Sequence, residues 1–405
     1  MEYWALVESL YNTTLSLFFF VLMSLMYYIG IKGYRAKNKY GGISSILCGI
    51  CFLIFGYYNS VIGFLAFPYN GFMVWWIGMT LLVNLLFTTI IRMDINKMKR
   101  EEKNEFKKES KNKEKTILRR YIRRMTRENP YREVIPFRME LIRKSFHLSG
   151  LLIFLAFFGF MTIPPITLLV NDSVITFIHQ IEPSYNLLWG DIADFPYGFG
   201  DFRAVVEITM FALIAALAFT IASDIIRIVW GPEYSFFNFL SKSMLRNKEK
   251  NAAGPQIYII TGFIFSYMLY MAGLIHIFVF FAGILIACLS DASAALIGRR
   301  FGKHKITLRN KDVKSVEGFI AGVAVAYIIG FIFVGPIYAI MGALVFFLID
   351  YLPSVTADNI LNPIFIPIGL QLMIFLFGLP VGWFIRILTL LKTSVLSVAH
   401  LMAIS

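Results

Sequence analysis

The sequence predicts an all-α, polytopic membrane protein with about ten transmembrane helices. Hydrophobic residues fill 58% of the 405 positions, which is more than a soluble domain carries. Apolar stretches of about 20 residues recur along the chain, and a helix of about that length crosses the hydrocarbon core of a bilayer. Charged residues make up 16% of the chain and gather between these stretches.

The apolar stretches give the expected helices in order. The first follows Glu2 and Glu8 and has no basic cluster before it, so we expect a retained span and not a cleaved signal peptide. The last is long enough to be broken or tilted at Gly378 and Pro380. The expected helices lie near 13–31, 42–67, 71–91, 147–169, 204–229, 256–273, 275–297, 316–334, 336–350 and 363–391.

The net charge of +13 is concentrated between the third and fourth helices. Residues 92–138 contain 17 Lys and Arg against 8 Asp and Glu, a local net charge of +9. The alternating charges predict a solvated helix or a disordered connector near anionic lipid headgroups. No nucleic-acid binding is expected, because a folded binding module and interleaved aromatic residues are both missing there. We therefore expect a three-helix region (1–92), a basic connector (93–139) and a second membrane domain (140–405).

Connections rich in Lys and Arg mark the cytoplasmic side of a membrane protein. Such connections follow the first, third, fifth and seventh expected helices, whereas residues 171–202 hold five acids and no Lys or Arg. This pattern predicts an amino terminus outside the cytoplasm. It also places five groups of polar residues at cytoplasmic helix ends.

The first group is a charged stripe at the entrance of the fourth helix. Glu140, Arg143, Lys144 and His147 follow the spacing i, i+3, i+4, i+7 and share one helix face. A charged stripe that runs into an apolar span must face protein or water. The structural alternative is an interfacial helix end with snorkelling cations and a Glu–Lys pair.

The second group lies at the end of the fifth helix and in the loop that follows. Asp224 and Arg227 are one turn apart and can form a local ion pair, so a structural role explains them as well as a functional one. Arg246 and Glu249 come next in the loop.

The third group is Asp291 among small residues at the end of the seventh helix, namely Ser290, Ala292, Ser293, Ala294, Ala295 and Gly298. The lack of bulk lets another backbone or a ligand approach closely. A Mg²⁺ ion suits this acid, because magnesium takes one or two carboxylates and completes its shell with water and phosphate oxygens. A hydrogen-bonded structural acid is the alternative.

The fourth group is the loop that begins with Gly298, Arg299 and Gly302. It is one residue short of a P-loop and has His304 where Ser or Thr is needed, so it is not a Walker A motif. Its glycines, its cations and the helix amino terminus near 314–318 would nevertheless favour a phosphate group. The fifth group, Asp358 with Asn359, forms a common turn pair before the last span.

Taken in order along residues 140–391, these groups resemble the membrane-embedded lipid-alcohol kinase family that includes dolichol kinase, phytol kinase and CTP-dependent diacylglycerol kinase. Ser290 departs from the family, in which a glycine often precedes the aspartate, and residues 1–139 lie outside the resemblance. The residues that carry it are Glu140, Arg143, Lys144, His147, Asp224, Arg227, Arg246, Glu249, Asp291, Gly298, Gly302, Lys314, Glu317, Gly318, Asp358, Asn359 and Pro363.

The resemblance implies transfer of the γ-phosphate of CTP to a long-chain isoprenoid alcohol such as dolichol, with Mg²⁺ as cofactor. Asp291 and Asp358 are then expected to hold the metal, and either Glu140 or His147 to position or deprotonate the alcohol. Residues expected at the nucleotide are Gly298, Arg299, Gly302, Lys314, Glu317, Gly318 and Arg246. Residues expected at the substrate or its headgroup are Arg143, Lys144, Asp224, Arg227 and Asn359.

Two other classes of protein fit part of the pattern. A cytidylyltransferase that makes CDP-lipids would also need CTP, Mg²⁺ and cations at the membrane edge. A transporter would also have about ten helices, but it would carry acids or broken helices near the middle of the membrane. The sequence places few charges there.

Overall fold

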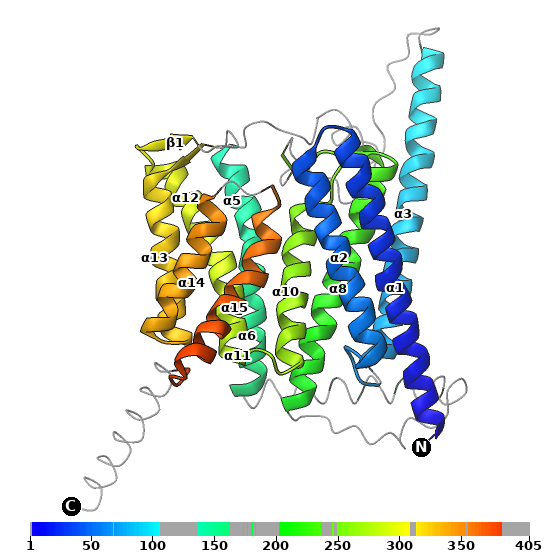
Figure 1. Ribbon diagram of the computed structural model, residues 1–405. Helices are drawn as coiled ribbons and strands as arrows, with labels where there is room; N and C mark the ends of the chain where they lie inside the picture. Colours follow the sequence, from blue (N-terminus) through cyan, green and yellow to red (C-terminus); the bar gives the residue numbers. More distant parts are fainter. Residues whose placement is uncertain are drawn as a thin grey trace, which may run out of the picture. The chain divides into compact units, whose positions relative to one another are not determined.

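The computed structural model describes residues 2–67, 69–105, 136–162, 202–235, 245–246, 249–307, 313–352 and 355–382, with four isolated positions between 173 and 183. Most of the basic connector, the acidic loop expected at 171–202 and the segment after residue 382 therefore lie outside the described residues. The described secondary structure is almost entirely helical, and a two-stranded ribbon is its one β-sheet (Figure 1).

Seven described helices are long and apolar enough to cross a membrane, so the chain is a multi-pass membrane protein with a helical fold. Three shorter helices, α6 (Ser149–Thr162), α10 (Pro255–Met271) and α14 (Pro336–Tyr351), lie at further expected positions. The total of about ten spans stays a prediction. The seven candidate spans are Ala5–Arg35, Lys39–Val61, Tyr69–Lys97, Val205–Val229, Ile277–Phe301, Val316–Phe333 and Asp358–Phe377.

The chain forms two compact units. Unit 1 comprises Met1–Ile142 and Leu155–Thr261, and unit 2 comprises Arg143–Phe154 and Gly262–Ser405. The helix at 202–229 groups with the first three helices in unit 1, and the division into a three-helix region, a connector and a second membrane domain stays a prediction. The border between the units falls inside α5 (Phe137–Ser145).

Unit 1 is built on α1 (Glu2–Arg35), α2 (Lys39–Val61), α3 (Tyr69–Glu105) and α8 (Phe202–Val229). Helices α1 and α2 form a close antiparallel pair, since a Cβ atom at Gly42 would lie 2.8 Å from the carbonyl oxygen of Gly30 (Figure 1). Buried aromatic rings fill the space beside this pair: the ring centroid of Phe19 lies 5.7 Å from that of Phe55 and 5.6 Å from that of Phe64.

Unit 2 contains a helical rod of three consecutive parts, α11 (Ile277–Leu285), the π-helical turn η5 (Ile286–Ser290) and α12 (Asp291–Phe301). The ribbon of β1 (Lys305–Thr307) and β2 (Val313–Ser315) follows the rod and pairs Ile306 with Lys314. The hydroxyl of Ser315 caps α13 (Val316–Phe333) by accepting the backbone N–H of Gly318 at 3.1 Å. A single π turn inside an α-helix is often found at functional sites.

The last described helix differs from the expectation of a span at 363–391. Helix α15 begins at Asp358, contains Pro363 and Pro367, and ends at Phe377, where Gly378 adopts the left-handed conformation with φ 64°. The predicted break at Gly378 is therefore a helix end. Pro367 has no N–H to donate to the carbonyl oxygen of Pro363, and the hydroxyl of Ser266 donates to that oxygen instead.

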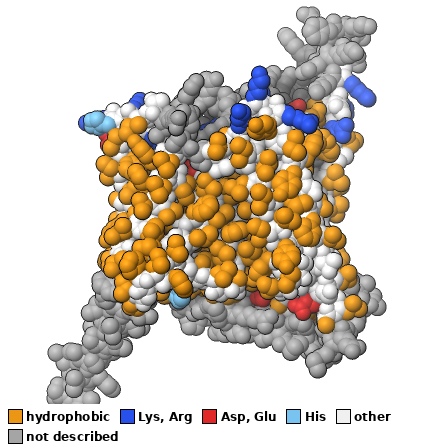
Figure 2. Space-filling model, viewed as in Figure 1, with side chains coloured by type: hydrophobic (Ala, Val, Ile, Leu, Met, Phe, Trp, Pro, Cys, Tyr) orange, Lys and Arg blue, Asp and Glu red, His pale blue; other side chains and the backbone are white. Residues whose placement is uncertain are grey.

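Two glycines make room for the rings of these prolines. A Cβ atom at Gly262 would lie 2.9 Å from Pro363, and one at Gly283 would lie 2.2 Å from Pro367. The prolines thus seat α15 against α10 and α11 and fix the position of Asp358 at its first turn. On the face that Figure 2 draws, the exposed side chains of the helices are mainly apolar.

Candidate functional site

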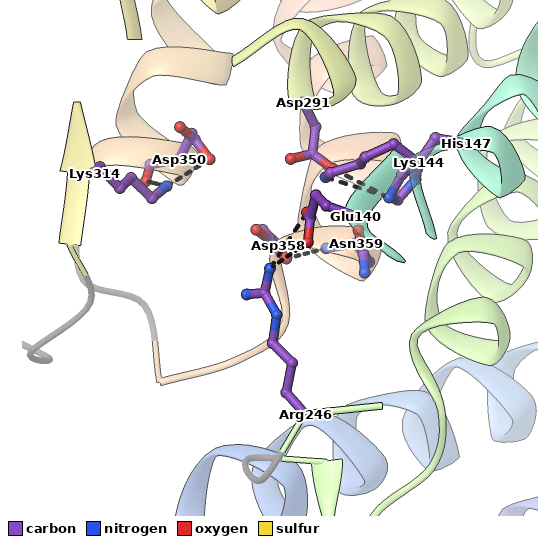
Figure 3. Close-up of polar contacts among 9 residues, drawn as sticks. All are labelled: Glu140, Lys144, His147, Arg246, Asp291, Lys314, Asp350, Asp358 and Asn359. Carbon is purple, nitrogen blue, oxygen red and sulfur yellow. Dashed lines mark hydrogen bonds and ion pairs between the residues drawn. The ribbon is translucent and has the colours of Figure 1, made fainter. Parts of the chain in front are cut away.

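Two side chains of the predicted charged stripe contact the carboxylate of Asp291, the first residue of α12. Lys144 Nζ on α5 donates to Asp291 Oδ2, and His147 Nε2 lies 3.3 Å from the same oxygen (Figure 3). All three residues are buried within unit 2. The i, i+3 spacing turns Lys144 and His147 toward the same carboxylate.

A glycine allows α6 to approach the π turn and so brings the stripe to Asp291. A Cβ atom at Gly150 would lie 2.7 Å from the Sγ atom of Cys288, which lies three residues before Asp291. Any larger residue at 150 would force η1 (Phe146–Leu148) away from η5.

His147 is held in its neutral form. Burial and the positive charge of Lys144 lower the pKa of His147 to about 4, although the charge of Asp291 acts in the opposite direction; Arg143, also buried, adds to the lowering. A neutral imidazole has one N–H and one lone pair. Its Nδ1 atom is buried and has no hydrogen-bond partner among the described residues.

Three carboxylates from three helices converge in unit 2. Asp291 on α12, Asp350 near the end of α14 and Asp358 at the start of α15 each place a ligand oxygen within 4.8 Å of the others. Asp291 and Asp350 are buried, and Asp358 is partly exposed. Asp358 also accepts the backbone N–H of Asn359 at 2.9 Å. The sequence predicted that Asp291 and Asp358 act together.

Asp350 is the functional candidate that the sequence analysis missed. It lies in the last turn of an apolar helix, between Ile349 and Tyr351, with no second charged residue within one turn to draw attention to it. A signal was nevertheless present, because α14 ends on the side assigned to the cytoplasm from the Lys and Arg pattern. An acid at that end of a span belongs with the other polar helix ends.

Lys314 on β2 binds the same cluster. Its Nζ donates to Asp350 Oδ1 at 2.7 Å and to the Asp350 carbonyl oxygen (Figure 3). Burial alone would lower the pKa of Lys314, but the charges of Asp350, Asp358 and Asp291 outweigh it and raise the pKa above the ordinary value. Lys314 therefore stays protonated beside the acids.

The donor set suits a hard divalent cation. Three carboxylates offer only oxygen ligands, which Mg²⁺ prefers, and Lys144 and Lys314 offset only part of the negative charge. Two buried polar atoms next to the acids along their helices, Ser290 Oγ and Asn362 Oδ1, have no partner among the described residues. Buried polar atoms of this kind call for a bound water, ion or ligand.

The glycines expected to approach a phosphate are used for packing. A Cβ atom at Gly318 would lie 2.7 Å from the Cα atom of Gly298, and one at Gly302 would lie 2.5 Å from the Cβ atom of Ser315. These contacts hold α12, β2 and α13 together. Gly298, Gly302 and Gly318 thus help to position Lys314, and their expected role at a nucleotide stays a prediction.

Glu317 and Arg299 lie at the surface of the same region. Glu317 accepts the backbone N–H of His304 at 3.1 Å and lies 2.8 Å from its ring nitrogen Nδ1, so it fixes the start of the ribbon. Arg299 is exposed in the last turn of α12.

Asp224 and Arg227 pair with each other inside unit 1. Arg227 donates to the two carboxylate oxygens of Asp224 at 2.6 Å and 2.9 Å, and also to the carbonyl oxygen of Ala252 at 2.7 Å. Asp224 also accepts the backbone N–H of Gly254 at 2.7 Å. Since the Arg227 side chain is 0% exposed, the pair acts as a clamp on the loop before α10.

Glu140 and Arg246 meet in the same unit. Arg246 donates to Glu140 at 3.5 Å (Figure 3). Glu249 accepts the backbone N–H of Arg246. The Glu140 carboxylate is fully buried, whereas Arg246 is partly exposed. Glu140 thus anchors the loop that carries Arg246.

Comparison of the chain with known protein families, with curated proteins and with solved structures found no match. The fold alone therefore defines the class of the protein, a multi-pass helical membrane protein. The activity of the protein is inferred from the residues of the site.

Proposed function

We propose that the protein is a CTP-dependent lipid-alcohol kinase, which transfers the γ-phosphate of the nucleotide to a long-chain isoprenoid alcohol at the cytoplasmic face of the membrane. The convergence of Asp291, Asp350 and Asp358 with Lys144 and Lys314 carries the proposal. Phosphoryl transfer depends on positioning and on neutralisation of charge, and carboxylates with lysines supply both. The order of the sequence groups, which resembles lipid-alcohol kinases, supports the same activity.

The charged residues of the cluster in unit 2 have distinct roles in this proposal. Asp291, Asp350 and Asp358 would hold Mg²⁺, which neutralises charge on the phosphate oxygens when it is bound. Lys314 and Lys144 supply ammonium groups for the transferred phosphate, while the acids keep both lysines in place. Arg299, which is exposed at the end of α12 in unit 2, is a further candidate for a phosphate contact. Arg246 lies in unit 1, and its expected contact with the nucleotide stays a prediction.

His147 is the better of the two candidates for the group that accepts the proton of the alcohol. In the tautomer that donates Nε2–H to Asp291, the lone pair is on the buried, unpartnered Nδ1 atom. Such an arrangement orients the neutral ring and leaves a lone pair that can accept a proton. Glu140, in contrast, is occupied by Arg246.

A site at helix ends also suits the acceptor. The hydroxyl group of a lipid alcohol reaches the interface while its chain stays in hydrocarbon. Asp291, Asp350 and Asp358 all lie at the ends of apolar helices or at a helix interruption in unit 2, so they can meet a hydroxyl group at that depth.

Nucleotides labelled at either phosphate test the proposal. The purified protein in vesicles is incubated with Mg²⁺, a polyprenol and CTP labelled at the α- or the γ-phosphate, with UTP and ATP in parallel. We expect the γ-label in the lipid. Entry of the α-label would instead indicate cytidylyl transfer, and absence of label with every nucleotide and several alcohols would refute kinase activity.

A further inference from the structure

An apolar groove runs between α13 and α14 in unit 2, outside the charged cluster. Its volume is about 530 Å³, within the usual range for pockets that bind small ligands. Among its nine lining residues, Tyr327 alone has a polar side-chain atom. Four of the lining residues are exposed, so the groove is open at the apolar surface of the two helices; they are Ile320, Tyr327, Ile340 and Leu344.

The groove arises from the distribution of side-chain sizes. Near the turn between the helices the backbones nearly touch, since a Cβ atom at Gly330 would lie 2.8 Å from the Cα atom of Ala339. Toward the other end, Ala324 and Ala343 leave space between the larger Phe319 and Phe347. The groove therefore results from the sizes of the side chains on α13 and α14.

The end of the groove meets the charged cluster. Phe319 and Phe347 line the groove, their ring centroids are 4.9 Å apart, and Tyr351 stacks on Phe347 at 5.4 Å. Asp350 lies three residues after Phe347, a rise of about 4.5 Å along the helix axis, and it binds Lys314. One end of the apolar groove thus lies near the ammonium group of Lys314 and the carboxylate of Asp350.

We propose that the groove holds the apolar chain of the acceptor alcohol and presents its hydroxyl group to the site at Asp350 and Lys314. This inference rests on the proposed kinase function and adds the surface that selects the acceptor. An apolar chain next to a polar head is the ligand whose chemistry matches an apolar groove that ends at charged groups. A peptide would leave backbone polar groups without partners there.

Selection in the groove depends on fit. Bilayer hydrocarbon is as apolar as the groove, so the hydrophobic effect does not favour entry. Dispersion contacts with the aromatic rings and with the floor formed by Ala324 and Ala343 favour a chain that fills the space. A bulky side chain on this floor should therefore impair use of the alcohol without changing use of the nucleotide.

Ala324→Phe fills the groove, and Ala216→Phe is its matched control, because Ala216 is an exposed alanine in the span α8 of unit 1. Transfer of γ-label from CTP to a polyprenol is measured for both, at varied concentrations of alcohol and of CTP. We expect Ala324→Phe to lower kcat/KM for the alcohol by about tenfold or more relative to Ala216→Phe, with an unchanged KM for CTP. Equal kinetics in the two variants would overturn the groove assignment while the kinase activity stands.

A binding measurement separates this inference from the kinase activity. A polyprenol with a photoreactive group in its chain is cross-linked to the wild-type protein without nucleotide, and the labelled peptides are mapped. We expect labelling of α13 and α14 that unlabelled polyprenol suppresses and phospholipid does not. Suppression by phospholipid would show that the groove binds membrane lipids in general. A change of oligomeric mass in Ala324→Phe with unchanged kinetics would show that the groove is a contact between copies of the chain. Either result overturns the proposal.

Discussion

Replacement of Asp291 by Asn keeps the size of the side chain and removes its charge. Lys144 is 3% exposed and would lose the carboxylate that binds it. Removal of one partner from a buried ion pair costs about 3–5 kcal/mol. We expect a loss at the lower end, because Asp350 and Asp358 remain close by and the Asp291 side chain is 12% exposed.

Turnover should fall far more than stability. If Asp291 holds the metal, Asp291→Asn removes one of the three oxygen ligands and the partner of His147, so we expect a loss of about a thousandfold or more in kcat/KM. The assay is transfer of γ-label from CTP to polyprenol, normalised to folded protein measured by thermal unfolding in detergent.

A double variant separates the catalytic role from the structural one. Lys144→Met in the Asp291→Asn background removes both charges, so stability should return to within about 1 kcal/mol of the wild type, while turnover should stay lost. Glu207→Gln is the control, because it removes another buried carboxylate, which accepts the backbone N–H of Ala66 at 3.0 Å; its turnover per folded molecule should be unchanged. Recovery of turnover in the double variant would refute a metal-binding role for Asp291.

Three further predictions follow from the geometry. Asp350→Asn should raise the Mg²⁺ concentration needed for half-maximal turnover and lower turnover about a hundredfold, measured by titration of Mg²⁺ after chelation; an unchanged Mg²⁺ requirement would exclude Asp350 as a ligand. Asp224→Asn should lower the free energy of unfolding by about 3 kcal/mol, because Arg227 is left buried without its carboxylate. Turnover per folded molecule is expected to persist. A selective rise in KM for the alcohol would instead favour the role of Asp224 at the substrate headgroup that the sequence suggested. Gly150→Val should impair turnover, because the larger side chain forces Lys144 and His147 away from Asp291. Gly78→Val is the control, since no atom lies within 4 Å of a Cβ atom at Gly78. Equal turnover in the two variants would contradict the close approach of Gly150 to Cys288.

Much of the site was predictable because its residues repeat at helical spacing or sit at helix ends. Lys144 and His147 share a face by their spacing, and Asp291 and Asp358 were assigned to one side of the membrane from the Lys and Arg pattern alone. The structure brings the four together in one unit. These features are local, so a single helix or connection reveals them.

Other features depended on contacts between distant segments. Asp350 joins the cluster only because α14 and α15 pack beside α12, and nothing near Asp350 in the sequence indicates a partner. Gly298 and Gly318 resembled a phosphate loop, yet the spacing of glycines does not distinguish close approach to a ligand from close approach to another helix. The last helix begins at Asp358, before the predicted start at 363, because Ser266 and two glycines accommodate prolines that usually end a helix.

The sequence alone determined the class of protein, since the length of an apolar stretch and the position of charges are set by the chain itself and by the thickness of the bilayer. The tertiary structure alone decided which charges from distant segments meet: it paired Glu140 with Arg246 and gathered three acids around two lysines. The physical reason is that helix periodicity fixes which side chains share a face of one helix. Packing between helices, through contacts such as Gly150 on Cys288, fixes which faces touch.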